Sequence, residues 1–160
     1  MSEFYPVHIM TKPEGLPYQG YIDTQLELLE VMTGSKKIFE VRTILTPDEV
    51  DLIYPDPNIP TELKTNLATE ETQHRIILGN SEIYPKVKEL KGKMDSGGIR
   101  QFLLNISKKH QFPLERWQNF LHTSDNLLES QPVCSHFLSS AHLCQECAAK
   151  SICFSNQKTK

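Results

Sequence analysis

The chain has 160 residues with a net charge of −3, 38% hydrophobic and 23% charged side chains, and a mean hydropathy of −0.41. This composition is ordinary for a folded globular domain and excludes a long disordered or low-complexity chain. No apolar stretch reaches the roughly 18–20 residues that cross a bilayer, and the first residues lack a signal-peptide pattern. We therefore expect a cytoplasmic protein in a reducing compartment, without membrane contact.

The first half of the chain is predicted to mix short strands with helices. Segments 7–10, 37–45 and 75–78 are rich in β-branched and apolar residues, which is typical of strands. Residues 21–32 fit either a helix that ends at Gly34 or the first arm of a hairpin, and both interpretations stay open.

Helix signals occur at three further places. Residues 46–49 (Thr-Pro-Asp-Glu) have the form of a capping box, and the prolines that follow keep that helix short. The strongest signal is an apolar stripe at helical spacing, formed by Ile99, Phe102, Leu103 and Ile106. Pro113 is predicted to open a second helix with Leu114, Trp117 and Leu121 on one face, so that the two helices form a hairpin.

Charge divides the chain into two halves. Residues 1–85 contain six basic and fourteen acidic side chains, a net charge of −8, whereas residues 86–160 contain eleven and six, a net charge of +5. We predict a single α+β domain over residues 1–160: a short mixed β/α acidic half, then a basic half with the helical hairpin and a cysteine-ligated loop. The basic half favours contact with DNA or RNA, and any protein partner is expected on the acidic half.

All four cysteines lie within twenty residues near the carboxyl terminus, with the spacing C-x9-C-x2-C-x5-C. Thiolates gathered in this way bind a 4Fe–4S cluster or Zn²⁺. Only one close pair is present, whereas all-cysteine zinc sites usually contain two, so the spacing favours the cluster. The predicted ligands are Cys134, Cys144, Cys147 and Cys153, and zinc with His136 as a further ligand stays the alternative.

The segment Cys144-Gln-Glu-Cys-Ala-Ala-Lys-Ser-Ile-Cys153 resembles the iron–sulfur loop that ends endonuclease III-type DNA glycosylases. It is also similar to the cysteine triple that closes the RecB-like exonucleases associated with CRISPR adaptation. The resemblance covers only residues 134–154 and implies a 4Fe–4S cluster. Asp23 and Glu40 partly match the metal motif of the exonucleases, with Arg42 in place of its lysine, so a metal-dependent nuclease is the enzymatic alternative.

The predicted function is an iron–sulfur protein associated with nucleic-acid binding or processing, in which the cluster is mainly structural. Its candidate nucleic-acid contacts are the basic residues Arg100, Lys108, Lys109, Arg116 and Lys150. Two other classes stay open: a redox-sensing or cluster-bearing partner subunit without nucleic-acid contact, and a zinc-stabilised protein-interaction module. The histidines at 8, 74, 110 and 122 are scattered without ligand spacing, so no catalytic residue is assigned.

Overall fold

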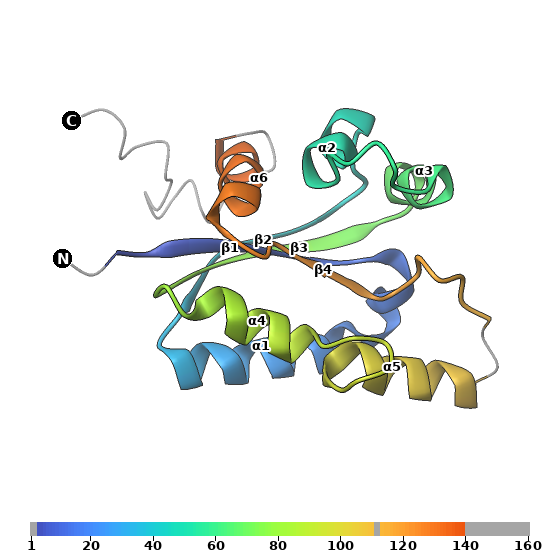
Figure 1. Cartoon of the computed structure of the whole chain (residues 1–160), viewed down its shortest axis with the longest axis horizontal. Coiled ribbons are helices and arrows are strands. Elements are labelled where there is room, and N and C mark those ends of the chain that lie inside the picture. The colour runs from blue at the N-terminus through green and yellow to red at the C-terminus, as the bar shows by residue number, and fades with distance from the viewer. Residues whose placement is uncertain (1–2, 111–112, 140–160) are drawn as a thin grey trace.

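The computed structural model describes residues 3–110 and 113–139, which form a four-stranded antiparallel sheet with helices on both faces (Figure 1). The strand order is β2-β3-β1-β4, so the first strand lies beside the last. The α+β class expected from the sequence is confirmed. In chain order the elements are β1 (Tyr5–Thr11), the 3-10 helix η1 (Pro13–Tyr18), α1 (Gln19–Thr33), β2 (Lys36–Thr43), α2 (Pro47–Ile53), α3 (Thr61–Thr69), β3 (Thr72–Gly79), α4 (Ile83–Lys91), α5 (Gly98–Lys109), β4 (Leu121–Thr123) and α6 (Leu127–Ser139).

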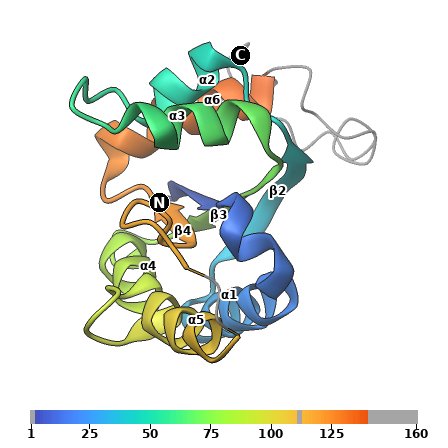
Figure 2. The same cartoon turned by 90° about the vertical axis from the view of Figure 1, so that its right-hand side faces the viewer.

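Each face of the sheet is covered by its own layer of helices. Helices α1, α4 and α5 lie on one face, and α2, α3 and α6 lie on the other (Figures 1 and 2). Side chains alternate along β1, so Val7 and Ile9 enter the first core and Met10 enters the second. All three are at most 1% exposed, and burial of each contributes on the order of 1.5–3 kcal/mol. Within residues 3–110 and 113–139, no helix is long and apolar enough to cross a membrane.

Two helices of the first half form for local reasons. Residues 21–32, for which the sequence allows either a helix or a hairpin arm, are helical. Helix α1 buries Ile22 and Leu26 and ends at Gly34, whose φ of 69° suits glycine. The predicted capping box of α2 is confirmed. Thr46 Oγ1 accepts from the Glu49 N–H at 3.3 Å, and the Glu49 carboxylate accepts from the Thr46 N–H at 3.0 Å.

The predicted helical hairpin is wrong in its second arm. Helix α5 forms and buries Ile99 and Leu103, but residues 113–119 are not helical, with a turn at 116–117, and Leu121 enters β4. Strand β4 pairs with the edge of β1, where Leu121 lies opposite Thr11. This pairing gives hydrogen-bond partners to backbone groups at that edge, and it outweighs the helical spacing of the apolar residues that follow Pro113.

The acidic and basic halves share one sheet, because β4 of the basic half pairs with β1 of the acidic half. The two carboxylates considered for a nuclease metal site both contact a buried arginine. Arg75 Nη2 lies 3.1 Å from Asp23 Oδ1 and 3.4 Å from Glu40 Oε2, and Arg75 is 4% exposed. The guanidinium neutralises these carboxylates and ties α1 and β2 to β3.

Candidate functional site

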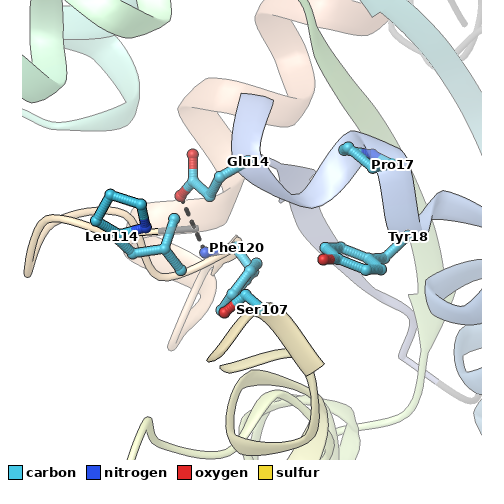
Figure 3. A pocket seen from close by; sticks show the side chains of 7 residues that line it. Glu14, Pro17, Tyr18, Ser107, Leu114 and Phe120 are labelled. Carbon is cyan, nitrogen blue, oxygen red and sulfur yellow. Dashed lines mark hydrogen bonds between the residues drawn. The ribbon is translucent and has the colours of Figure 1, made fainter. Parts of the chain in front are cut away.

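A left-handed turn at Phe120 leads the chain into β4. Phe120 has a φ of 70°, which costs a non-glycine residue on the order of 1–3 kcal/mol. The segment after β1 holds the turn: the Lys12 N–H donates to the Phe120 carbonyl at 2.8 Å, and the Phe120 N–H donates to the Glu14 carboxylate at 3.0 Å (Figure 3). This turn fixes where the neighbouring side chains of Asn119 and His122 project.

Replacing Gly15 by alanine should destabilise the protein by about 1–3 kcal/mol, because the site has no room for a side chain. The added Cβ would lie 2.8 Å from the Phe120 carbonyl oxygen and 2.8 Å from Thr11 Cγ2. Urea unfolding measures the effect. Gly20→Ala is the matched control, since nothing lies within 4 Å of its added Cβ, and it should stabilise α1 by roughly 0.5–1 kcal/mol. Equal stabilities for the two variants would contradict tight packing around the turn.

Lys12 is a buried cation directly after β1. It is 2% exposed, and its Nζ donates to the Trp117 carbonyl at 2.9 Å and to Asn119 Oδ1 at 2.8 Å. The Tyr54 ring centroid lies 5.8 Å from the same nitrogen, within the range of a cation–π contact. Burial lowers the pKa of Lys12 to about 8, and the nearby charge of Arg100 adds to this effect.

Arg100 brings a second cation to the same amide. Its guanidinium donates to Asn119 Oδ1 at 3.3 Å and to the Leu121 carbonyl, and its Nε is buried without a partner among the described residues. One neutral amide oxygen thus accepts hydrogen bonds from both Lys12 and Arg100. A third cation, Lys91, lies 3.8 Å from Asp125. Glu14 supplies one negative charge near Lys12 and Arg100, and an anionic ligand would add a further compensating charge.

His122 completes the cluster from β4. It lies opposite Met10, on the sheet face that α2, α3 and α6 cover, and its ring centroid is 4.5 Å from that of Tyr54. The side chain is half-buried. Burial lowers the pKa of His122 well below its ordinary value, and the positive charges of Lys12 and Arg100 contribute. The imidazole is therefore neutral at pH 7 and carries a free lone pair.

A neutral imidazole among fixed cations has the properties of a nucleophile for a negatively charged group. The lone pair can attack an electrophilic centre, and the cations stabilise the negative charge of the group that is transferred. Tyr54 and the buried strand limit the movement of the ring. The cluster of Lys12, Asn119, Arg100, Tyr54 and His122 is the candidate active site.

A separate pocket of about 320 Å³ lies behind the Phe120 turn (Figure 3). Burial raises the pKa of its one carboxyl group, that of Glu14. Neither Lys12 nor His122 lines this pocket, so it is distinct from the candidate active site. Its walls are mostly apolar and are formed by Glu14, Pro17, Tyr18, Ser107, Pro113, Leu114 and Phe120.

The basic residues predicted to contact nucleic acid differ in their surroundings. Arg100 points into the candidate active site, whereas Lys108 and Lys109 are exposed at the far end of α5, about 12 Å along the helix axis. Arg116 is exposed in the segment before β4. Lys150 lies outside the described residues.

Of the predicted cysteine ligands, the structure describes only Cys134, in α6. It is 2% exposed, packs among Val133 and Phe137, and lies 3.3 Å from Ser130 Oγ. Burial raises the pKa of Cys134 to about 12, so the group is a protonated core thiol rather than a thiolate. Cys144, Cys147 and Cys153 lie outside the described residues, and their binding of metal stays a prediction.

Sequence reasoning missed Lys12, Tyr54, Asn119 and His122. Lys12 follows an apolar strand, and Asn119 and His122 flank a short apolar pair, but each pattern is common in solvent-exposed turns. The useful signal is spatial. Lys12 and Asn119 are 107 residues apart in sequence and meet only because β1 pairs with β4.

The sheet and its two layers of helices have the fold of nucleoside diphosphate kinases. The chain is similar to the nucleoside diphosphate kinase of Borrelia burgdorferi with bound vanadate and ADP, a transition-state mimic, at 18% identity over 81% of this chain and 83% of that one, with a TM-score of 0.59. It is similar to the Aquifex aeolicus enzyme at 15% identity, 88% and 98% coverage and a TM-score of 0.59. It is also similar to a family protein of Babesia bovis at 21% identity, 82% and 86% coverage and a TM-score of 0.60. No protein-family model matches the chain, and neither does any curated protein.

These similarities correct the function predicted from the cysteines. The resemblance to endonuclease III-type glycosylases and RecB-like exonucleases is not supported, because the fold is that of nucleoside diphosphate kinases. The prediction of an iron–sulfur protein associated with nucleic acid is wrong for the same reason. In addition, no group of three or more His, Cys, Asp or Glu side chains that could hold a metal ion occurs among residues 3–110 and 113–139. A cysteine motif of twenty residues does not determine the topology of the whole chain.

Proposed function

We propose that the protein is a phosphotransferase that moves a phosphoryl group from a nucleoside triphosphate to a nucleoside diphosphate through His122. One observation carries the proposal: a neutral, half-buried imidazole lies beside two cations that are anchored to a single amide oxygen. The fold shared with nucleoside diphosphate kinases supports the nucleotide as substrate.

The first step forms a covalent phosphohistidine. The lone pair of one His122 ring nitrogen attacks the terminal phosphorus, and the bond from phosphorus to the bridging oxygen breaks. The electron pair of that bond stays on the oxygen, which leaves with the nucleoside diphosphate. In the second step an oxygen of another diphosphate attacks the phosphorus, and the ring nitrogen recovers its lone pair. Lys12 and Arg100 bind the phosphate oxygens and stabilise the charge that develops on them.

The two half-reactions can be measured separately. We expect ATP labelled at its terminal phosphate to transfer the label to the protein, in an acid-labile bond typical of phosphohistidine. Addition of unlabelled GDP should then move the label to GTP. Absence of label from both the protein and GTP, in a folded preparation, would overturn the proposal.

The activity should fall as the pH rises through about 8, because Lys12 then loses the proton that gives it charge. In kcat/KM, which reports the free enzyme, the fall should approach about tenfold per pH unit above that point. The free energy of unfolding should instead increase as the pH rises. Between about 8 and the ordinary lysine value the unfolded chain binds the extra proton, so Lys12 makes the folded state more stable as the pH rises. Lys12→Met should remove both pH effects, and their persistence in that variant would assign them to another group.

We also propose a cytoplasmic location. Cys134 lies in the core without a disulfide partner among residues 3–110 and 113–139, and a free thiol suits a reducing compartment. Fractionation of cells that express the full chain would test this, and recovery in a secreted fraction would contradict it.

A further inference from the structure

A buried pair of histidines lies next to His122 on the same face of the sheet. His8 of β1 and His74 of β3 are both fully buried, with ring centroids 5.2 Å apart and His8 Nε2 at 2.9 Å from His74 Nδ1. Phe137 of α6 stacks on His8, with centroids 5.5 Å apart. Two polar rings in an apolar core are costly unless their hydrogen bonds are satisfied.

A chain of hydrogen bonds fixes which nitrogen of each ring carries a proton. The Thr72 hydroxyl donates to the Thr43 carbonyl at 3.1 Å, so its oxygen accepts from His74 Nε2 at 2.6 Å. His74 Nδ1 is then a lone pair and accepts from His8 Nε2. With these donors and acceptors assigned, the remaining ring nitrogen, His8 Nδ1, carries a lone pair and is an acceptor.

His8 Nδ1 is buried and has no hydrogen-bond partner among the described residues. Burial lowers the pKa of His8 to about 3, so the ring stays neutral and does not acquire a proton of its own at this position. A buried acceptor without a donor costs on the order of 1–3 kcal/mol. The structure retains this cost directly beside the candidate active site.

The sheet brings His122, a hydrogen-bond donor, close to His8. His122 lies opposite Met10, and His8 precedes Met10 by two residues, so His8 and His122 share a face as diagonal neighbours. Such neighbours lie about 7–8 Å apart, with their Cβ atoms somewhat closer, a span that two imidazoles cover through one bridging water. The His8 carbonyl also accepts from the Ser124 N–H at 3.1 Å, which ties the two strands together at this level.

We propose that His8 is a positioning residue for His122: its Nδ1 accepts a hydrogen bond from one bridging water, and that water accepts a hydrogen bond from the ring N–H of His122. This bond holds His122 in the tautomer whose other nitrogen presents its lone pair to the phosphate. The same arrangement accepts a hydrogen bond from the ring N–H of His122 after the imidazole is phosphorylated. The inference rests on the proposed function for its catalytic consequence, but the hydrogen bond itself does not.

The test combines the variants His8→Phe and His8→Gln with two readouts. Phenylalanine keeps a ring stacked on Phe137 but removes the acceptor, whereas the glutamine amide offers both a donor and an acceptor, as neutral imidazole does. Long-range ¹H–¹⁵N correlation spectra of the nucleotide-free protein report the tautomer of His122. We expect one tautomer in the natural chain and in His8→Gln, and a mixture in His8→Phe. Met10→Leu, a volume-conserving change on the same strand face, should leave the spectrum unchanged.

The kinetic readout separates positioning from folding. In His8→Phe, kcat should fall by about 10–100-fold with KM unchanged, the usual size of effect for residues that orient a reacting group. His8→Gln should recover most of that loss. An unchanged His122 tautomer in His8→Phe, or a loss of activity in His8→Gln as large as in His8→Phe, would overturn the inference. If the natural chain transfers no phosphate, the proposed function fails, and the spectra still decide whether the hydrogen bond exists.

Discussion

Replacing His122 by alanine should abolish phosphoryl transfer, with kcat lower by on the order of 10⁴-fold or more, because the reaction loses its nucleophile. No labelled protein should form from labelled ATP. The change removes a half-buried ring that contacts Tyr54, so its effect on stability should be much smaller than its effect on activity. Circular dichroism and thermal unfolding check that the variant is folded.

His110→Ala is the matched control for that experiment. His110 is exposed at the end of α5, outside the candidate active site, and its backbone N–H rather than its ring ends the helix. We expect its labelling and kcat to equal those of the natural chain. A His122→Ala protein that still accepts the label would show that another group is the nucleophile.

Arg100→Gln should lower kcat/KM by on the order of 10²–10³-fold, the range seen when one fixed donor to a developing anion is removed. Glutamine can still donate to the Asn119 amide but carries no charge for the phosphate oxygens. The variant also loses the hydrogen bond to the Leu121 carbonyl at the start of β4, so urea unfolding should accompany the kinetics. A near-normal kcat/KM would remove Arg100 from the phosphate site.

The double variant Lys108→Gln with Lys109→Gln serves as control. These lysines are exposed at the other end of the same helix, and the sequence predicts that they contact nucleic acid. If the anion site is the compact cluster around Asn119, their loss leaves kcat/KM within about twofold, as expected for screened surface charges. A loss as large as that of Arg100→Gln would instead indicate a broad polyanion-binding surface.

Much of the fold could be predicted where local chemistry decides it. The strands at 37–45 and 75–78 and the capping box at Thr46 depend on neighbouring residues, and each is confirmed. The second arm of the helical hairpin failed because β4 exists through its pairing with β1, more than a hundred residues away. Only three residues form β4, too few for a period-2 pattern to outweigh the helical spacing around Trp117.

The site was harder to predict than the fold because its residues carry no shared motif in the sequence. The charge of Arg100 indicates a binding role in the sequence, and the structure places Arg100 in the candidate active site with Asn119 and His122. The sequence does not indicate His122, because the neutrality of its imidazole comes from burial and from cations on other elements. The cysteine spacing was conspicuous by comparison, yet Cys134 is a core thiol.

Because the sheet places its first strand next to its last, a ribosome must release nearly the whole chain before Lys12 can meet Asn119. A product truncated before β4 would therefore be inert rather than weakened, with the edge of β1 left open to pair with other chains. The same long-range closure makes the site a late event in refolding, so catalysis should recover after the helical signal has already returned.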